Sequence, residues 1–321
     1  MNLLKYICLP GLLASGDIQT VSAVETDKNP NILVILIDDA GYNDFGFMGS
    51  KEMQTPNIDA LTSEGVVFTD AHVAATVSSP SRACLITGRY GHRFGYECNL
   101  SDRTNGLPLE EETIAEVFKT NGYRTAAIGK WHLGSRDEQH PNNRGFDLFY
   151  GMKAGGRDYF YNEKKSDRPG DERNLLLNDR QVKFEKYLTD AFSEKAVEFI
   201  NESSQPFMMY LAYNAVHTPM QATDEDMAKF EGHPRQKLAA MTYALDRGVG
   251  TVIRGLKDSG KFDNTLIFFL SDNGGATTNQ SSNYPLKGFK GNKFEGGHRV
   301  PYFVVWKNGI PAGKPYDGLV S

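Results

Sequence analysis

Short apolar runs rich in branched residues alternate along this chain with longer amphipathic segments. Runs of this length predict buried strands, and their alternation with helices is typical of an α/β protein built around a mostly parallel sheet. A length of 321 residues is enough for one large domain with a substantial core. The predicted strands cover residues 31–37, 125–128, 207–213, 266–270 and 300–306, and the predicted helices cover residues 56–64, 110–121, 189–201 and 237–259.

The start of the chain has the features of a weak signal peptide. Lys5 precedes an apolar run over residues 6–13, and the small residues at 21–23 resemble a cleavage site. Residues 1–23 are therefore predicted to be a signal peptide, which implies a periplasmic or secreted protein; a disordered leader is the alternative. No run reaches the ~18 apolar residues that a membrane helix needs, so no membrane span is predicted.

Polar side chains follow four of the predicted strands at the point where each strand ends. Because the carboxyl ends of parallel strands meet at one edge of a sheet, where open α/β sheets bind their ligands, these side chains are candidates for a functional site. In chain order they are Asp38 and Asp39, Lys130 and His132, His217, and Asp272 with Asn273.

The acidic residues of this set indicate a metal site. Asp38 and Asp39 would repel each other in a low-dielectric cleft unless a cation neutralised them, and Asp272 with Asn273 ends a second strand in the same way. Three carboxylates and an amide oxygen suit Ca²⁺ or Mg²⁺ and disfavour Zn²⁺. The alternative is that these residues serve only as helix caps and turn formers.

Basic side chains in the same segments could bind an anion. The formal net charge of -5 gives no general attraction for nucleic acid or for sulfated polyanions, so any anion must be bound by a local cluster. Lys130, His132, His217 and Lys290 lie on predicted loops where a bound anion could meet them. Arg82 precedes an apolar run over residues 83–86 that is predicted to begin a buried helix, and a helix start attracts anions.

Residues 78–88, SSPSRACLITG, resemble the signature of the type I sulfatases, in which Cys or Ser is followed by any residue, Pro, Ser or Ala, and Arg, with Leu and Thr-Gly downstream. The resemblance runs from about Asn29 to the last residue and implies a sulfatase catalytic domain over residues 29–321. It also implies an alkaline-phosphatase-like sandwich, in which a large, mostly parallel mixed sheet is flanked by helices. Further matching segments are TPNID at 55–59, GKWHLG at 129–134, DNGG at 272–275, PLKGFK at 285–290 and EGG at 295–297 followed by RVP at 299–301.

The resemblance implies that the protein is a sulfuric ester hydrolase, which acts on a sulfated carbohydrate or another small sulfate ester. It also implies a role for each site residue. It implies that a maturation enzyme converts Ser78 to formylglycine. A plain serine would form a stable alkyl sulfate, whereas a hydrated aldehyde can expel sulfate by re-forming its carbonyl. His217, which lies before Pro219, is favoured over His132 for protonating the leaving group, and Lys290 could share this task. The implied ligands of one Ca²⁺ are Asp38, Asp39, Asp272, Asn273 and Ser78, and the implied groups around the sulfate are Arg82, Lys130, His132, His217 and Lys290.

Two departures from the family pattern leave other readings open. The family normally continues into a small C-terminal domain that closes one side of the pocket, so the chain is expected to be truncated and this domain absent. Ser78 stands where many members carry Cys. The alternatives are a catalytically inactive homologue that binds sulfated glycans, and a phosphatase or phosphonate hydrolase of the same fold. The second alternative is disfavoured because the sequence lacks the cluster of His and Asp ligands that its zinc ions need.

Residues 150–186, rich in Gly, Arg, Asp and Asn, are predicted to form a loop region on the substrate side. Tyr159, Phe160 and Tyr161, beside Arg157 and Asp158, could stack on and hydrogen-bond a sugar. The alternative is that they serve in packing.

Overall fold

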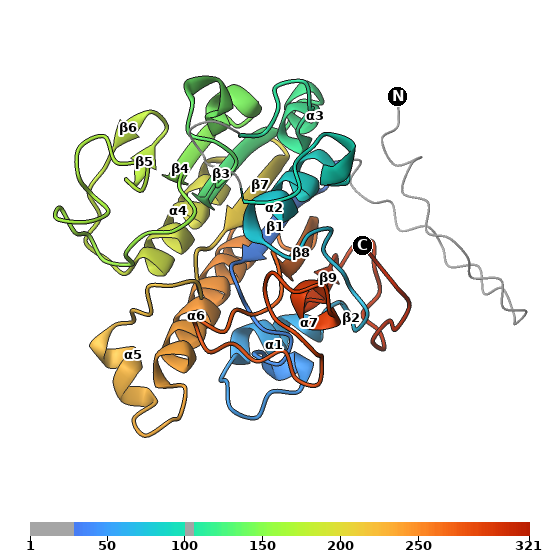
Figure 1. Ribbon diagram of the computed structural model, residues 1–321. Coiled ribbons are helices and arrows are strands. Elements are labelled where there is room, and N and C mark those ends of the chain that lie inside the picture. The colour runs from blue at the N-terminus through green and yellow to red at the C-terminus, as the bar shows by residue number, and fades with distance from the viewer. Residues whose placement is uncertain (1–28, 100–105) are drawn as a thin grey trace, which may run out of the picture.

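The computed structural model describes residues 29–99 and 106–321, so the predicted signal peptide lies outside the described residues. A nine-stranded sheet runs through the described part, in the order β2-β9-β8-β1-β7-β3-β4-β5-β6, with helices on both faces (Figure 1). The strands are β1 (Asn31–Ile37), β2 (Val66–Phe68), β3 (Arg124–Lys130), β4 (Leu148–Met152), β5 (Leu176–Leu177), β6 (Arg180–Gln181), β7 (Phe207–Ala212), β8 (Thr265–Ser271) and β9 (Tyr302–Val305).

The centre of the sheet is parallel and both of its edges are antiparallel. Strands β8, β1, β7, β3 and β4 pair in parallel. At one edge β9 and β2 are antiparallel, and at the other β5 and β6 are antiparallel. The predicted α/β class, with a large and mostly parallel mixed sheet between helices, is therefore confirmed.

Strand β1 lies in the middle of the sheet because its sequence, NILVILI, can be buried on both faces. Its alternate side chains Leu33, Ile35 and Ile37 pack in one apolar cluster with residues of α1, α4 and α6, and the others pack in a second cluster with residues of α2 and α3. The α-helices are α1 (Pro56–Thr62), α2 (Ser78–Thr87), α3 (Ile114–Thr120), α4 (Leu188–Glu202), α5 (Asp224–Lys229), α6 (Gln236–Asp258) and α7 (Glu295–His298).

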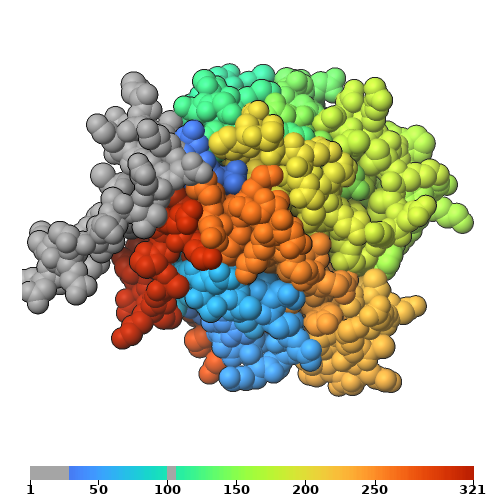
Figure 2. Space-filling model, turned by 180° about the vertical axis from the view of Figure 1, so that it is seen from behind, coloured from blue at the N-terminus to red at the C-terminus, as the bar shows by residue number. Residues whose placement is uncertain are grey.

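One face of the sheet is covered by the long helix α6, which packs against α4 on one side and α1 on the other. Figure 2 shows this face from outside, with α6 in orange between the yellow of α4 and the blue of α1. None of the helices in residues 29–99 and 106–321 is both long and apolar enough to cross a membrane.

The structure differs from the sequence-based expectation at several places. It contains β2, α5 and α7, which the apolar pattern did not predict, and α3 begins at Ile114 and not at residue 110. Helix α2 begins at Ser78, not near residue 83, so its first residue is the serine and Arg82 lies in its second turn. The region 150–186 is not a simple loop, because it contains the end of β4 and the short hairpin of β5 and β6. These strands are too short, and β4 is too interrupted by Gly151, for the apolar pattern to predict them.

Candidate active site

The carboxyl edge of the sheet gathers the predicted site residues. Asp38 and Asp39 follow β1, Asp272 and Asn273 follow β8, and Lys130 is the last residue of β3. These strands lie within one parallel block, so their ends meet at the same edge. The loop after β7 adds His217, and the first turn of α2 adds Ser78.

Ser78 lies at the centre of this cluster and is 1% exposed. Its Oγ lies 3.1 Å from Oδ1 of Asp38, 3.3 Å from Oδ1 of Asn273 and 3.5 Å from Nζ of Lys130. Because Ser78 begins α2, the amide dipoles of that helix favour negative charge at this point. Lys130 and the helix start therefore favour negative charge at this hydroxyl, whereas Asp38 and Asn273 accept its hydrogen.

Arg82 is fully buried and positions Asp272. Its Nε and Nη2 donate to Oδ2 of Asp272 at 3.0 Å and 2.8 Å, and its Nη1 donates to the backbone carbonyl of Lys130 at 3.1 Å. Nη2 also lies 3.6 Å from Oδ1 of Asp38. The guanidinium therefore links the ends of β3, β1 and β8.

Lys130 forms the second buried ion pair of the site. Its Nζ donates to Oδ2 of Asp38 at 2.7 Å. Burial alone would raise the pKa of Asp38, but the charges of Lys130, His217 and Arg82 outweigh it and hold this pKa well below its usual range. The preceding Gly129 has φ +107°, and a Cβ there would lie 1.9 Å from the carbonyl oxygen of Ala212, so only glycine lets β3 approach β7 at this point.

Asp39 has a φ of 62°, which turns its carboxylate into the cluster. One oxygen, Oδ1, lies 2.7 Å from Nζ of Lys290 and accepts from Nδ2 of Asn273 at 2.8 Å. Nε2 of His217 lies 3.7 Å from Oδ2. The side chains of His217 and Lys290 are 23% and 19% exposed, whereas Asp39 is only 2% exposed, so the site opens to solvent on the side of His217 and Lys290.

The oxygen ligands of this cluster fit a hard divalent cation. Ligand atoms of Asp38, Asp39 and His217 lie within 4.8 Å of one another. Asp272 lies beside this group, where its Oδ1 accepts from the amide of Asp39 at 3.3 Å and its Oδ2 accepts from Arg82. Burial and the nearby charge of Asp38 raise the pKa of Asp272, which is the repulsion that a cation would relieve. The carboxylate oxygens of the group suit a hard cation such as Ca²⁺, and His217 adds one nitrogen atom to it.

His132 is held at the edge of the site in its neutral form. Burial, followed by the charges of Lys130 and Arg82, lowers the pKa of His132 well below its ordinary value of 6.5. Its φ is 57°, and its backbone carbonyl accepts from Oγ of Ser79 at 2.8 Å. An imidazole with a lowered pKa is a poor proton donor.

Two residues position the loops of the site. The sequence left Tyr159 open between sugar stacking and packing, and the structure shows packing, whereas Asn279 was not singled out. Tyr159 is fully buried, and its hydroxyl lies 2.6 Å and 2.8 Å from the carbonyl oxygens of Asn214 and His217, so it holds the His217 loop and packs inside the protein. Asn279 donates through Nδ2 to the carbonyl oxygens of Asp39 and Val216. No local pattern could reveal these contacts, because Asn279 and Asp39 are 240 positions apart.

Gly155 offers a test of how closely His132 must be placed. A Cβ at Gly155 would lie 2.6 Å from Nε2 of His132, so Gly155→Ala is expected to displace the ring and lower kcat by roughly 100-fold. At Gly156 the nearest atoms to a Cβ are ring atoms of His217 at 3.4 Å, an ordinary contact that displaces nothing, so Gly156→Ala is the matched control and should keep most of the activity. Steady-state kinetics and thermal unfolding of both variants check this. Equal kinetics in the two variants would show that the position of His132 is unimportant.

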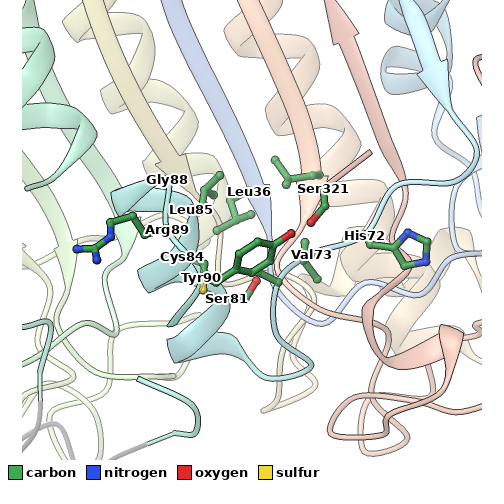
Figure 3. Close-up of a pocket in the computed structure, with 12 residues that line it drawn as sticks. Leu36, His72, Val73, Ser81, Cys84, Leu85, Gly88, Arg89, Tyr90 and Ser321 are labelled. Carbon is green, nitrogen blue, oxygen red and sulfur yellow. The ribbon is translucent and has the colours of Figure 1, made fainter. Parts of the chain in front are cut away.

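A separate hollow of about 290 Å³ lies on the other side of α2 (Figure 3). Its lining is mostly apolar, includes Leu36, Ser81, Cys84 and Tyr90, and contains none of the site residues described above. Ser81 and Cys84 therefore face away from the cluster that Ser78 and Arg82 enter from the same helix.

A mostly parallel mixed sheet between helices, with an acidic cluster and a buried serine at its carboxyl edge, is the architecture of the alkaline-phosphatase-like superfamily. Within it, the chain belongs to the sulfatase family, whose family model, described as Sulfatase, matches residues 30–321. The resemblance to type I sulfatases found in the sequence is thereby confirmed.

Known proteins similar to this chain carry related names. It is 33% identical over 94% of its length to the uncharacterized sulfatase YdeN of Escherichia coli (strain K12), and 32% identical over 100% of its length to the N-acetylgalactosamine-6-sulfatase of Canis lupus familiaris. The chain spans 62% and 63% of the lengths of these two relatives. A crystal structure of Ps i-CgsB in complex with k-i-k-neocarrahexaose has a TM-score of 0.87 and 45% identity, over 91% of this chain and 69% of that chain.

Proposed function

We propose that this protein hydrolyses a sulfate ester of a carbohydrate at Ser78. The observation that carries the proposal is the position of the Ser78 hydroxyl, buried at the start of α2 and within 3.5 Å of Asp38, Asn273 and Lys130. The proposed carbohydrate substrate is supported by two similar proteins, one named N-acetylgalactosamine-6-sulfatase and one, Ps i-CgsB, described in complex with k-i-k-neocarrahexaose.

The charges of the site suit an anionic ester. The carboxylates Asp38, Asp39 and Asp272 face three basic side chains, Arg82, Lys130 and Lys290. A divalent cation would therefore leave the site positive, which would attract a sulfate group and stabilise the charge on its oxygens. His217, on the open side, is placed to protonate the leaving oxygen of the sugar.

The proposed cofactors follow from the same residues. Asp38, Asp39, Asp272 and Asn273 would hold one Ca²⁺ beside Ser78, and this ion would supply positive charge to the oxygens of the sulfate group. Conversion of Ser78 to formylglycine by a maturation enzyme would supply a group that can release sulfate after its transfer. We further propose that the protein acts in the periplasm or outside the cell, as its first residues suggest.

The proposed activity can be tested on one preparation of the protein. A sulfate ester and a phosphate ester of the same phenol are assayed first, and sulfated oligosaccharides are assayed next. We expect hydrolysis of the sulfate ester, loss of activity on chelation and recovery with Ca²⁺. Faster hydrolysis of the phosphate ester would favour a phosphatase or phosphonate hydrolase. Binding of a sulfated oligosaccharide without turnover, with Ser78 unmodified by mass spectrometry, would favour an inactive glycan-binding protein.

A further inference from the structure

A second group of metal-ligating side chains lies apart from the active site. Glu295 and His298 lie one turn apart on the short helix α7, and His72 faces them from a segment that pairs with Arg299. One ligand atom from each of the three residues lies within 4.8 Å of the others. In Figure 3, His72 lies at the edge of the hollow, away from Tyr90.

The contacts of Glu295 bring two histidine nitrogens to one carboxylate oxygen. Its Oε1 lies 3.3 Å from Nε2 of His72 and 3.8 Å from Nε2 of His298. Zinc binds nitrogen and oxygen ligands at about 2.0–2.2 Å, so the ligands around one tetrahedral ion lie roughly 3.4 Å apart. The spacing of these atoms is therefore close to that of a metal site.

The hydrogen bond of His298 shows which of its nitrogens is available. Its Nδ1 lies 3.1 Å from the carbonyl oxygen of Phe294, and because a carbonyl only accepts, Nδ1 carries the hydrogen. In the neutral ring Nε2 then presents its lone pair toward Oε1 of Glu295. Two electron-rich atoms facing each other are unfavourable unless a proton or a metal cation lies between them.

Glu295 also contacts the guanidinium of Arg299. Nη1 of Arg299 lies 3.4 Å from Oε2 of Glu295 and 3.3 Å from Oδ1 of Asp70, and Nε2 of His72 lies 3.1 Å from the same Oε2 of Glu295. The same Asp70 oxygen lies 3.9 Å from Nδ1 of His72. At 3.9 Å the two groups form no hydrogen bond, so Asp70 adds negative charge beside the imidazole without fixing its orientation.

We propose that His72, Glu295 and His298 bind a Zn²⁺ ion, independently of the active site. Two histidines, one carboxylate and a water complete the four-coordinate shell that zinc prefers, and the mixed nitrogen and oxygen ligands disfavour Ca²⁺.

The ion would cross-link two segments of the chain that reach the active site. One segment runs from His72 to Ser78, and the other runs from Lys290 to His298. They already pair through the amide of Gly291, which donates to the carbonyl of Thr76 at 2.8 Å, and through the amide of Val73, which donates to the carbonyl of His298 at 2.9 Å. Zinc would add a side-chain link to these backbone contacts.

The proposal can be tested by titration calorimetry, in which Zn²⁺ is added to chelator-treated protein. Excess Ca²⁺ is present so that the acidic cluster of the active site is occupied. We expect one equivalent of Zn²⁺ to bind and to raise the temperature of unfolding. The variants His298→Gln and Glu295→Gln should each weaken binding by about 100-fold or more. The exposed His92 lies outside the group, so His92→Gln is the matched control and should bind as the parent does.

Binding of Co²⁺ supplies a second readout that does not depend on activity. A four-coordinate Co²⁺ site absorbs strongly in the visible range, and this absorption should disappear in His298→Gln while circular dichroism stays unchanged. The proposal is overturned if the parent protein does not bind Zn²⁺, or if both variants bind Zn²⁺ and Co²⁺ as the parent does.

Discussion

Replacing Ser78 by alanine is expected to lower the hydrolysis of sulfate esters by roughly 10⁴-fold or more, with the fold intact. The hydroxyl is the only nucleophile that lies among Asp38, Asn273 and Lys130 in the described part of the chain. Alanine removes its hydrogen bonds but adds no bulk, so the free energy of unfolding should fall by only about 1 kcal/mol. Steady-state kinetics with an aryl sulfate and chemical denaturation measure the two effects.

Ser81→Ala is the matched control for this variant. Ser81 lies on the same helix, three residues further along, but lines the hollow on the other side of α2. Alanine at this position also keeps the sulfatase signature intact. The control should retain activity and should show the loss of two hydrogen atoms from Ser78 that marks its oxidation to the aldehyde. Substantial turnover by Ser78→Ala would remove this residue from the mechanism.

The sequence could predict the strands that end at the site, because each is a continuous apolar run followed by residues with unusual chemistry. Strand β1 was predicted with its observed bounds, and β7 and β8 to within one residue of theirs. Since parallel strands place their carboxyl ends together, the pattern also predicted that Asp38 and Asp272 approach each other. In the structure these two carboxylates share the guanidinium of Arg82.

The pairing within the site could not be predicted, because it depends on contacts between distant residues. Nothing near Arg82 in the sequence indicates that its guanidinium reaches Asp272, 190 positions away. The start of α2 was misplaced because Ser78, Ser79 and Pro80 are not an apolar run, although proline is well tolerated in the first turn of a helix. For Tyr159 the sequence could only leave sugar binding and packing as alternatives, since aromatic residues serve in both, and the buried ring decides for packing.

Replacing Asp272 by alanine is expected to lower both activity and stability. The carboxylate is 1% exposed and accepts two hydrogen bonds from Arg82, so its loss leaves a buried guanidinium without its main partner. Breaking a buried pair in this way costs about 3–5 kcal/mol, and we expect the free energy of unfolding to fall by that amount. Calcium binding, measured by titration calorimetry, should be lost together with turnover, because Asp272 is one of the proposed ligands.

A double variant separates the effect of the unpaired guanidinium of Arg82 on stability from the effect of Asp272 on calcium binding. In Asp272→Ala with Arg82→Met no charge is left unpaired, so much of the lost stability should return while calcium binding and hydrolysis do not. Asp190→Ala is the control, because Asp190 is 27% exposed and its partner Arg247 keeps a second carboxylate, Asp226; its cost should stay below about 1 kcal/mol. Calcium-dependent hydrolysis by Asp272→Ala would refute the proposed metal site. A double variant no more stable than the single one would instead show that the unpaired guanidinium is not what destabilises the protein.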